Sequence, residues 1–261
     1  MRKNFIPGVF LALLILSACG TASLFDRIGP NGDRDWLCFG PGRSWVYTIE
    51  NDGQAGYETI TNQLVPTTLL GDGLHLVFSN ANQSGQAEPR ISAWYPTKRG
   101  WRQHLDLLLA LPPGTSNINA EPRILDLPFI ESPLVAGTSM RTEAVQKIEG
   151  FLLPPELSPV RLDGLVTSIS TIEETDIVQD AAKRRFENCI TVRTITEVKL
   201  ITTAPSGPWT SGDIIQYSRK EALLWLAPDV GIIRFEIKTE SRDLWNKRNR
   251  SLMRGELAKP D

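Results

Sequence analysis

Apolar and polar residues alternate along most of the chain after Trp36, in short runs that end at glycine, proline, asparagine or aspartate. Successive side chains of an extended strand point to opposite faces, so Trp45, Tyr47 and Ile49 share one face of a strand over residues 44–50. Asn51-Asp52-Gly53 follows as a hairpin turn. Similar runs recur at the spacing typical of all-β domains, at residues 57–62, 73–79 and 90–95.

The longest alternating runs lie in the second half of the chain. In residues 190–200 the even positions are apolar or threonine, and the odd positions are mostly polar or charged. In residues 232–240, Ile233, Phe235 and Ile237 alternate with charged residues. An apolar face opposite a solvent-exposed polar face predicts antiparallel strands that cover a core on one side.

A hairpin turn is predicted between residues 213–226 and the strand at 232–240. Pro228 presets the backbone for the second position of a turn, Asp229 suits the third, and Gly231 can adopt the positive φ that closes such a loop. These three residues therefore mark the connection between two paired strands.

The alternation breaks down between residues 104 and 133, where five prolines disfavour both helix and central strand. We interpret residues 112–133 as a joint between two sheet layers or subdomains. Only residues 177–186 have the pattern of a helical turn, and their Lys183-Arg184-Arg185 run is typical of a solvated loop face. The pattern as a whole predicts an all-β, antiparallel fold of the half-barrel or sandwich-like type.

The first residues have the features of a secretory signal. Arg2 and Lys3 precede an apolar run that ends at Leu16-Ser17-Ala18-Cys19, and this run is too short for a permanent membrane span. Leu16-Ser17-Ala18-Cys19 resembles a bacterial lipobox, and this resemblance implies a diacylglycerol thioether on Cys19. We therefore expect a signal peptide at 1–18, a lipidated cysteine and polar tether at 19–35, and a β domain at 36–261.

Charge and composition narrow the range of partners. The formal net charge is −2, and removal of Arg2 and Lys3 with the signal makes it −4. A phosphate backbone requires a basic surface, so nucleic acid is not an expected partner. Attachment to the membrane is expected to come from the N-terminal lipid, because two or three acyl chains anchor a protein without a polybasic patch.

Two cysteines remain once Cys19 is modified. Cys38 and Cys189 would lie in a compartment where disulfides persist, so they are a candidate pair. The alternative is that both are small buried residues, because nothing in the sequence brings their Cα atoms within bonding range.

Four short motifs carry a resemblance to a known group of proteins. They are Gly42-Arg43-Ser44-Trp45-Val46-Tyr47, Gly137-Thr138-Ser139, Phe186-Glu187-Asn188-Cys189 and Leu226-Ala227-Pro228-Asp229-Val230-Gly231-Ile232-Ile233. Their order resembles a widespread group of uncharacterised bacterial lipoproteins with the motifs G-x-S-W-x-Y, G-T-x-W, F-x-N-C and Y-A-P-G-V-G-L-V. Met140 stands in place of the usual Trp, and Asp229 in place of Gly. The resemblance implies an antiparallel half-barrel and supplies no activity.

Residues suited to catalysis are sparse in the sequence. His75 and His104 lack partners at metal-ligand spacing, so no metal is expected. No Gly-x-Ser-x-Gly elbow or dinucleotide fingerprint occurs, so neither a hydrolase triad nor a nucleotide cofactor is predicted. Glu173 and Glu174 are adjacent, and on a strand they would point to opposite faces.

The tryptophans are the remaining candidates for a site. Exposed aromatic rings can stack on sugars or hold acyl chains, whereas buried ones pack in a core. The candidate apolar or aromatic binding surface consists of Trp45, Tyr47, Trp101 and Trp225.

These observations predict a lipid-anchored envelope protein without enzymatic activity, with a binding or scaffolding role. The favoured partner is an apolar ligand, a lipid or a protein segment held on a curved sheet. One alternative is a structural component that acts through an envelope protein, and another is a hydrolase of cell-wall or surface polymer. The expected location is the outer membrane facing the periplasm in a diderm organism, and otherwise the outer face of the cell membrane.

Overall fold

A computed structural model describes residues 36–38, 43–65, 74–81, 90–97, 99–105, 119–122, 125–131, 134–153, 158–174, 177–205 and 208–260. Within these ranges the chain forms strands and turns and no helix. The strands are β1 Ser44–Asn51, β2 Gln54–Val65, β3 Leu74–Ala81, β4 Arg90–Thr97, β5 Gly100–Leu105, β6 Asn119–Glu121, β7 Leu125–Glu131, β8 Ser139–Leu153, β9 Ser158–Glu174, β10 Ile177–Gln179, β11 Arg185–Glu187, β12 Ile190–Thr202, β13 Ile214–Ala227, β14 Gly231–Arg242 and β15 Arg248–Pro260.

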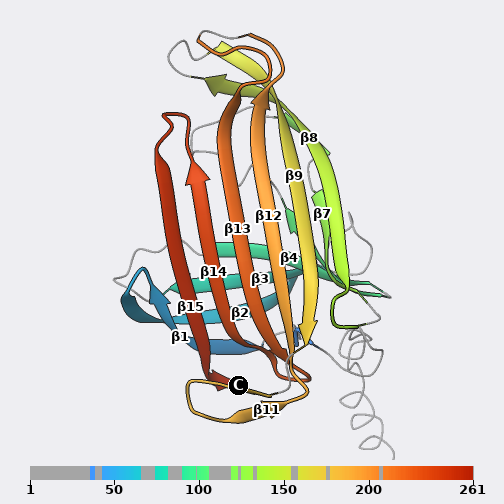
Figure 1. Cartoon of the computed structure of the whole chain (residues 1–261), viewed down its shortest axis with the longest axis vertical. Helices are drawn as coiled ribbons and strands as arrows, with labels where there is room; N and C mark the ends of the chain where they lie inside the picture. Colours follow the sequence, from blue (N-terminus) through green and yellow to red (C-terminus); the bar gives the residue numbers. More distant parts are fainter. Residues whose placement is uncertain are drawn as a thin grey trace, which may run out of the picture.

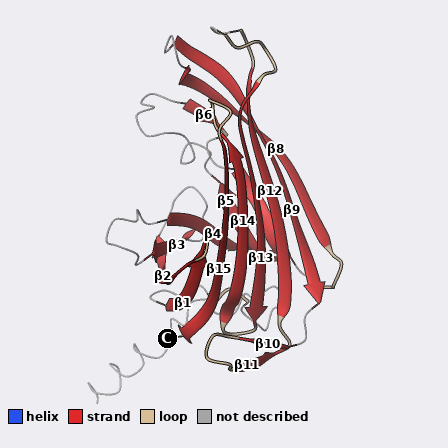
Figure 2. Cartoon of the chain, turned by 60° about the vertical axis from the view of Figure 1, so that its left-hand side comes forward, coloured by secondary structure: helices blue, strands red, loops and turns tan. Residues whose placement is uncertain are grey.

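Thirteen of the strands form one antiparallel sheet, in the order β6-β8-β9-β12-β13-β14-β15-β1-β2-β3-β4-β5-β7. The long strands β8, β9 and β12–β15 stand side by side, and β1–β4 run across them on one side (Figure 1). A second view shows that the long strands bend toward this crossing layer (Figure 2). Among the described strands the sheet has two ends, at β6 and β7, so this curved sheet does not close into a barrel. The predicted all-β antiparallel fold is confirmed.

The connection predicted near residues 112–133 contains both ends of the sheet. β6 pairs with β8, whereas β7 pairs with β5, in a register that sets Pro128 opposite Arg102. Proline lacks a backbone donor and is therefore confined to edge strands and bulges. The two described prolines of this region, Pro122 directly after β6 and Pro128 within β7, thus coincide with short strands at the two edges of the sheet.

Three apolar clusters fill the concave side. The base cluster joins β1, β12, β13 and β14, and its fully buried residues include Tyr47, Leu226 and Ile233. The upper cluster consists of Ile148, Phe151, Val160, Leu162, Leu200 and Ile215. The β7 cluster places Leu125 and Leu127 of β7 against Val166 of β9. The alternation in the sequence therefore supplies a nearly continuous core along the inner face.

Two local predictions have different outcomes. The turn at residues 227–231 is confirmed, with φ of +62° at Asp229 and +97° at Gly231. The helical turn predicted at 177–186 is wrong, because these residues form the β10–β11 hairpin. Asp180 causes this difference: its Oδ1 accepts the backbone N–H groups of Ala182 and Arg184 at 2.9 Å each, and Lys183 adopts a φ of +62°.

Candidate functional site

The predicted aromatic surface is mostly core. Trp45, Tyr47 and Trp101 expose at most 4% of their area and belong to the base cluster. Trp45 Nε1 donates to the carbonyl of Val230 at 3.2 Å, and the Tyr47 hydroxyl donates to the carbonyl of Ile232 at 2.7 Å. For these three residues the prediction of a binding surface is corrected: the apolar ring is buried and, in Trp45 and Tyr47, the polar atom is satisfied by the β13–β14 hairpin.

Trp225 is the fourth member of that predicted surface, and it packs against the base cluster that contains the other three. It is half-buried, and the Arg234 guanidinium stands 4.8 Å from its ring centroid. Its register partners are Thr191 and Arg234, both on the convex face of the long strands. This geometry is a cation–π contact. The four residues therefore do not form one exposed binding surface.

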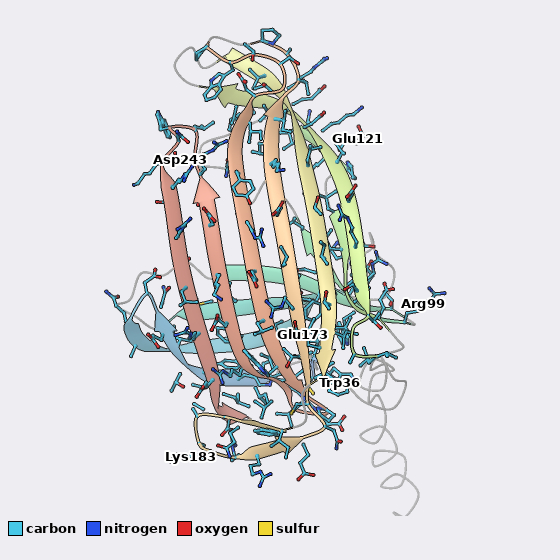
Figure 3. The ribbon with its side chains drawn as sticks, in the orientation of Figure 1. Trp36, Arg99, Glu121, Glu173, Lys183 and Asp243 are labelled. Carbon is cyan, nitrogen blue, oxygen red and sulfur yellow. The ribbon has the colours of Figure 1, made fainter. Side chains whose placement is uncertain are left out.

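The hairpin residues Pro228, Asp229 and Gly231 have a structural role. Gly231 faces the N-terminal segment so closely that a Cβ at this position would lie 3.0 Å from the carbonyl oxygen of Leu37. Val230 donates its N–H to Ala227 across the turn at 3.3 Å. The turn thus holds residues 36–38 against the base cluster, near the bottom of the molecule as drawn, where Trp36 is labelled (Figure 3).

Cys38 and Cys189 are both buried thiols of the base cluster. Cys189 donates its Sγ–H to the carbonyl of Phe186 at 3.3 Å, and burial raises the pKa of this thiol. The structure contains no disulfide between the two residues. It matches the alternative in which both are small buried side chains. Cys19, the predicted lipidation site, lies outside the described residues.

The concave face between the base and upper clusters carries paired hydroxyl groups. Ser170 and Thr194 lie 3.0 Å apart, and Ser168 and Thr196 lie 3.3 Å apart, in each case across the β9–β12 pair. The two hydroxyl groups of each pair hydrogen-bond to each other, and the β7 cluster packs beside them. Between the two clusters, the described part of the concave face therefore carries polar groups as well as apolar ones.

Charged side chains gather on the convex face. Arg193 bridges Glu173 and Glu221 at 2.8 Å each, and Arg219 pairs with Glu197 at 3.1 Å. Further along, Lys238 and Arg254 both contact Glu236, and their hydrogen bonds lower the pKa of this carboxyl. A general acid of a glycoside hydrolase needs a carboxyl with a raised pKa, so Glu236 does not suit that role.

A groove of about 390 Å³ lies over the upper part of β13–β15. Its charged lining residues carry both signs, and three of them, Arg219, Lys238 and Arg250, already have carboxylate partners. Such a balanced surface has no marked preference for a cation or an anion. In the part of the chain that the structure describes, no cluster of three or more His, Cys, Asp or Glu side chains suits a metal ion.

Part of the outer edge of β8 is open among the described residues. One side of β8 pairs with β9 along almost its whole length, whereas the other side, within the described residues, pairs only with β6 through Lys147–Glu149. Residues 139–145 therefore present a sheet edge. Arg141 and Glu143 form an ion pair there, each with a side chain that is 64% exposed, and Val145 is 49% exposed.

The open edge of β8 could not be predicted from the sequence, because strand alternation does not reveal which strand ends a sheet.

No helix within the described ranges is long and apolar enough to cross a bilayer. Among the described residues, the structure thus brings together an open sheet edge on β8 and a packed apolar interior.

Comparison with known proteins gives fold-level likeness alone. No family model matches the chain, and no curated protein matches it. One similar solved structure is a candidate lipoprotein from Parabacteroides distasonis, with 15% identity, a TM-score of 0.42, and coverage of 87% of this chain and 99% of that chain. Another is a candidate exported protein with a YmcC-like fold from Bacteroides fragilis, with 10% identity, a TM-score of 0.38, and coverage of 87% and 98%.

Proposed function

We propose that this protein is a lipid-anchored, non-enzymatic envelope component that acts as a scaffold by pairing its β8 edge with that of a second copy. The lipobox at Leu16-Ser17-Ala18-Cys19 supports the anchor. Diacylglycerol on Cys19 would hold the β domain outside the cytoplasm, on the periplasmic side of the outer membrane in a diderm cell, or otherwise on the outer face of the cell membrane.

The open edge of β8 is the observation that carries the scaffold role. Unpaired N–H and C=O groups along a sheet edge form a template for another strand, and proteins normally cover or shorten such edges. Here seven consecutive residues, 139–145, have no strand partner among the described residues, beside a β6 strand of three residues. Addition of a strand would satisfy the backbone groups of this stretch, as in other strand-addition complexes.

The charges along this edge are self-complementary. In an antiparallel pair of two β8 edges centred on Thr142, Arg141 of each copy lies opposite Glu143 of the other. Opposite charges facing each other across strands stabilise a pair, whereas like charges destabilise it. Val145, now exposed, would face Ser139 of the second copy, and Met140 would face Ala144 on the concave side. A two-fold pair of this kind closes on itself and yields a dimer.

Cysteine crosslinking in intact cells tests this register. Thr142→Cys places identical thiols on the two-fold axis, where directly opposite Cβ atoms are about 4.5–5.5 Å apart. The full-length chain with this substitution should form a disulfide-linked dimer. Val145→Cys alone is the matched control, because its two copies would be about 20 Å apart on antiparallel strands.

A mixture of Ser139→Cys and Val145→Cys chains, each with its own tag, should crosslink between the two tags. Thr142→Cys chains that remain monomeric would refute the proposal. Equal crosslinking of Thr142→Cys and Val145→Cys would indicate random collision and would refute the register. Adducts with other proteins only would reject the second copy as the partner.

A further inference from the structure

The β14–β15 hairpin ends in an exposed tryptophan. Trp245 exposes 73% of its area, more than any other large hydrophobic residue that the structure describes. The tip begins at Asp243, which Figure 3 labels at the end of the long strands opposite Trp36. β12 has 13 residues, and at about 3.3 Å per residue it spans about 43 Å between the two ends of the long strands.

The exposure of Trp245 follows from a well-built turn. Asp243 Oδ1 accepts the backbone N–H groups of Trp245 at 3.0 Å and of Lys247 at 2.9 Å. Asn246 adopts a φ of +60° and donates its N–H to the Asp243 carbonyl at 2.9 Å. Leu244 packs against the upper cluster. The turn therefore directs one apolar side chain inward and holds the neighbouring indole in solvent.

Positive charge surrounds this indole. Residues 242–250 contain four cations and one carboxylate, although the whole chain has a formal charge of −2. That carboxylate, Asp243, is engaged with backbone N–H groups, and Arg250 pairs with Glu240. Arg242, Lys247 and Arg248 form no ion pair within the described residues, and the tip therefore carries uncompensated charge.

Two of these cations face each other. Arg242 and Arg248 are register partners on β14 and β15. Like charges directly opposite on neighbouring strands are destabilising, and an anion bound beside them would relieve the repulsion. This second observation is independent of the exposed indole, and it indicates an anionic ligand at the tip.

We infer that the tip formed by Arg242, Trp245, Lys247 and Arg248 binds the surface of an anionic lipid bilayer. Tryptophan partitions to the level of the lipid headgroups, and arginine and lysine bind anionic headgroups around it. Sugars are typically held in concave sites with fixed polar partners. Here a protruding turn carries cations that have no ion-pair partner among the described residues, which suits a fluid surface of headgroups.

This inference does not depend on the lipid at Cys19 or on the β8 dimer. A molecule that stands upright on an N-terminal anchor would present the tip to a second surface, because Trp36 and Asp243 lie at opposite ends (Figure 3). The anchored protein would then act as a spacer between two surfaces. The test must therefore separate the binding of the tip from the binding of the anchor.

The full-length lipidated protein is placed in phosphatidylcholine nanodiscs, so that the anchor is already occupied. Sucrose-loaded vesicles of phosphatidylcholine with about one third phosphatidylglycerol are then added and sedimented. We expect nanodiscs that carry the protein to sediment with these vesicles, and not with pure phosphatidylcholine vesicles. Each cation near an anionic surface strengthens binding about fivefold, so Arg242→Gln/Lys247→Gln/Arg248→Gln should weaken the association about 100-fold.

Trp245→Ala should weaken it without changing the preference for anionic lipid. The matched control is the double variant Lys183→Gln/Arg185→Gln, which removes two cations from the β10–β11 hairpin. It is compared with Lys247→Gln/Arg248→Gln, which removes two cations from the tip. The control should bind like the wild type. Equal sedimentation with neutral vesicles, or equal loss in the control, would overturn the inference. Binding to soluble polygalacturonate but not to vesicles would identify a glycan and would also overturn it.

Discussion

The ring of Phe235 lies directly over Gly255. The two residues are register partners on β14 and β15, and a Cβ at Gly255 would be 2.2 Å from Cζ of the ring. Tyr47 packs edge-on against the same ring, with centroids 5.4 Å apart. Gly255 thus makes room for an aromatic side chain at the point where the long strands meet the crossing layer.

Substitution of Gly255 by alanine is expected to destabilise the fold. Phe235 is buried in the base cluster, so the ring cannot move away without disturbing its neighbours, and overpacking of this kind costs about 1–3 kcal/mol. Urea unfolding of the wild type, Gly255→Ala, Phe235→Leu and the double variant measures the coupling. The alanine should cost clearly less in the Phe235→Leu background. Additive effects would show that the contact is not the cause.

Much of the long sheet was predictable from alternation. Residues 190–200 and 232–240 are strands because their apolar positions recur with a period of two, and the turn at Asp229 follows from local turn chemistry. The period fixes which residues share a face and leaves open which face another layer covers. Trp45 and Tyr47 were therefore predicted as a candidate surface, although they lie in the crossing layer and the long strands bury them.

His104 is a buried titratable residue without hydrogen bonds at either ring nitrogen. Its ring centroid lies 4.6 Å from that of Tyr95, and Asp126 is its register partner. Burial lowers the pKa of His104, against the opposing effect of the Asp126 carboxylate. Within the described residues the nearby charged groups that act on it are Asp126 and Arg102. The folded protein therefore favours the neutral ring.

This shift predicts that stability is lost in acid. Below about pH 6.5 the unfolded chain protonates His104 while the folded chain does not, so the free energy of unfolding falls by up to about 1.4 kcal/mol per pH unit until the lower folded pKa is reached. His104→Phe keeps a ring against Tyr95 and removes two unpaired nitrogens. It should flatten the profile between pH 5 and 7 and cost no stability at pH 7. An unchanged slope would contradict this assignment.

The β10–β11 hairpin depends on a single carboxylate. Asp180 has a fully buried side chain that accepts two backbone N–H groups and pairs with Arg184. Hydrogen bonds to a charged group contribute about 1.5–3 kcal/mol each, so Asp180→Ala should open this hairpin locally. Trypsin should then cleave faster beside Lys183 and Arg185. Arg184→Gln removes the ion pair and keeps the backbone bonds, so it should resist cleavage; equal rates for both variants would contradict this account.

Other features were beyond a local reading of the sequence. β1 pairs with β15 although the two strands lie at opposite ends of the chain, and β6 and β7 are close in sequence yet end the sheet on opposite sides. The open edge of β8 follows from this long-range pairing. The β10–β11 hairpin was missed for a local reason: the Asp180 carboxylate accepts two backbone N–H groups and turns a stretch with a helix-like pattern into a hairpin.

Native mass spectrometry of the full-length protein, extracted from membranes in a mild detergent, tests the central claim most directly. The account predicts a dimer in which each chain begins at an acylated Cys19 and carries no other apolar small molecule. A monomer that releases a lipid or another apolar compound would contradict it, because the protein would then hold a ligand on its concave face.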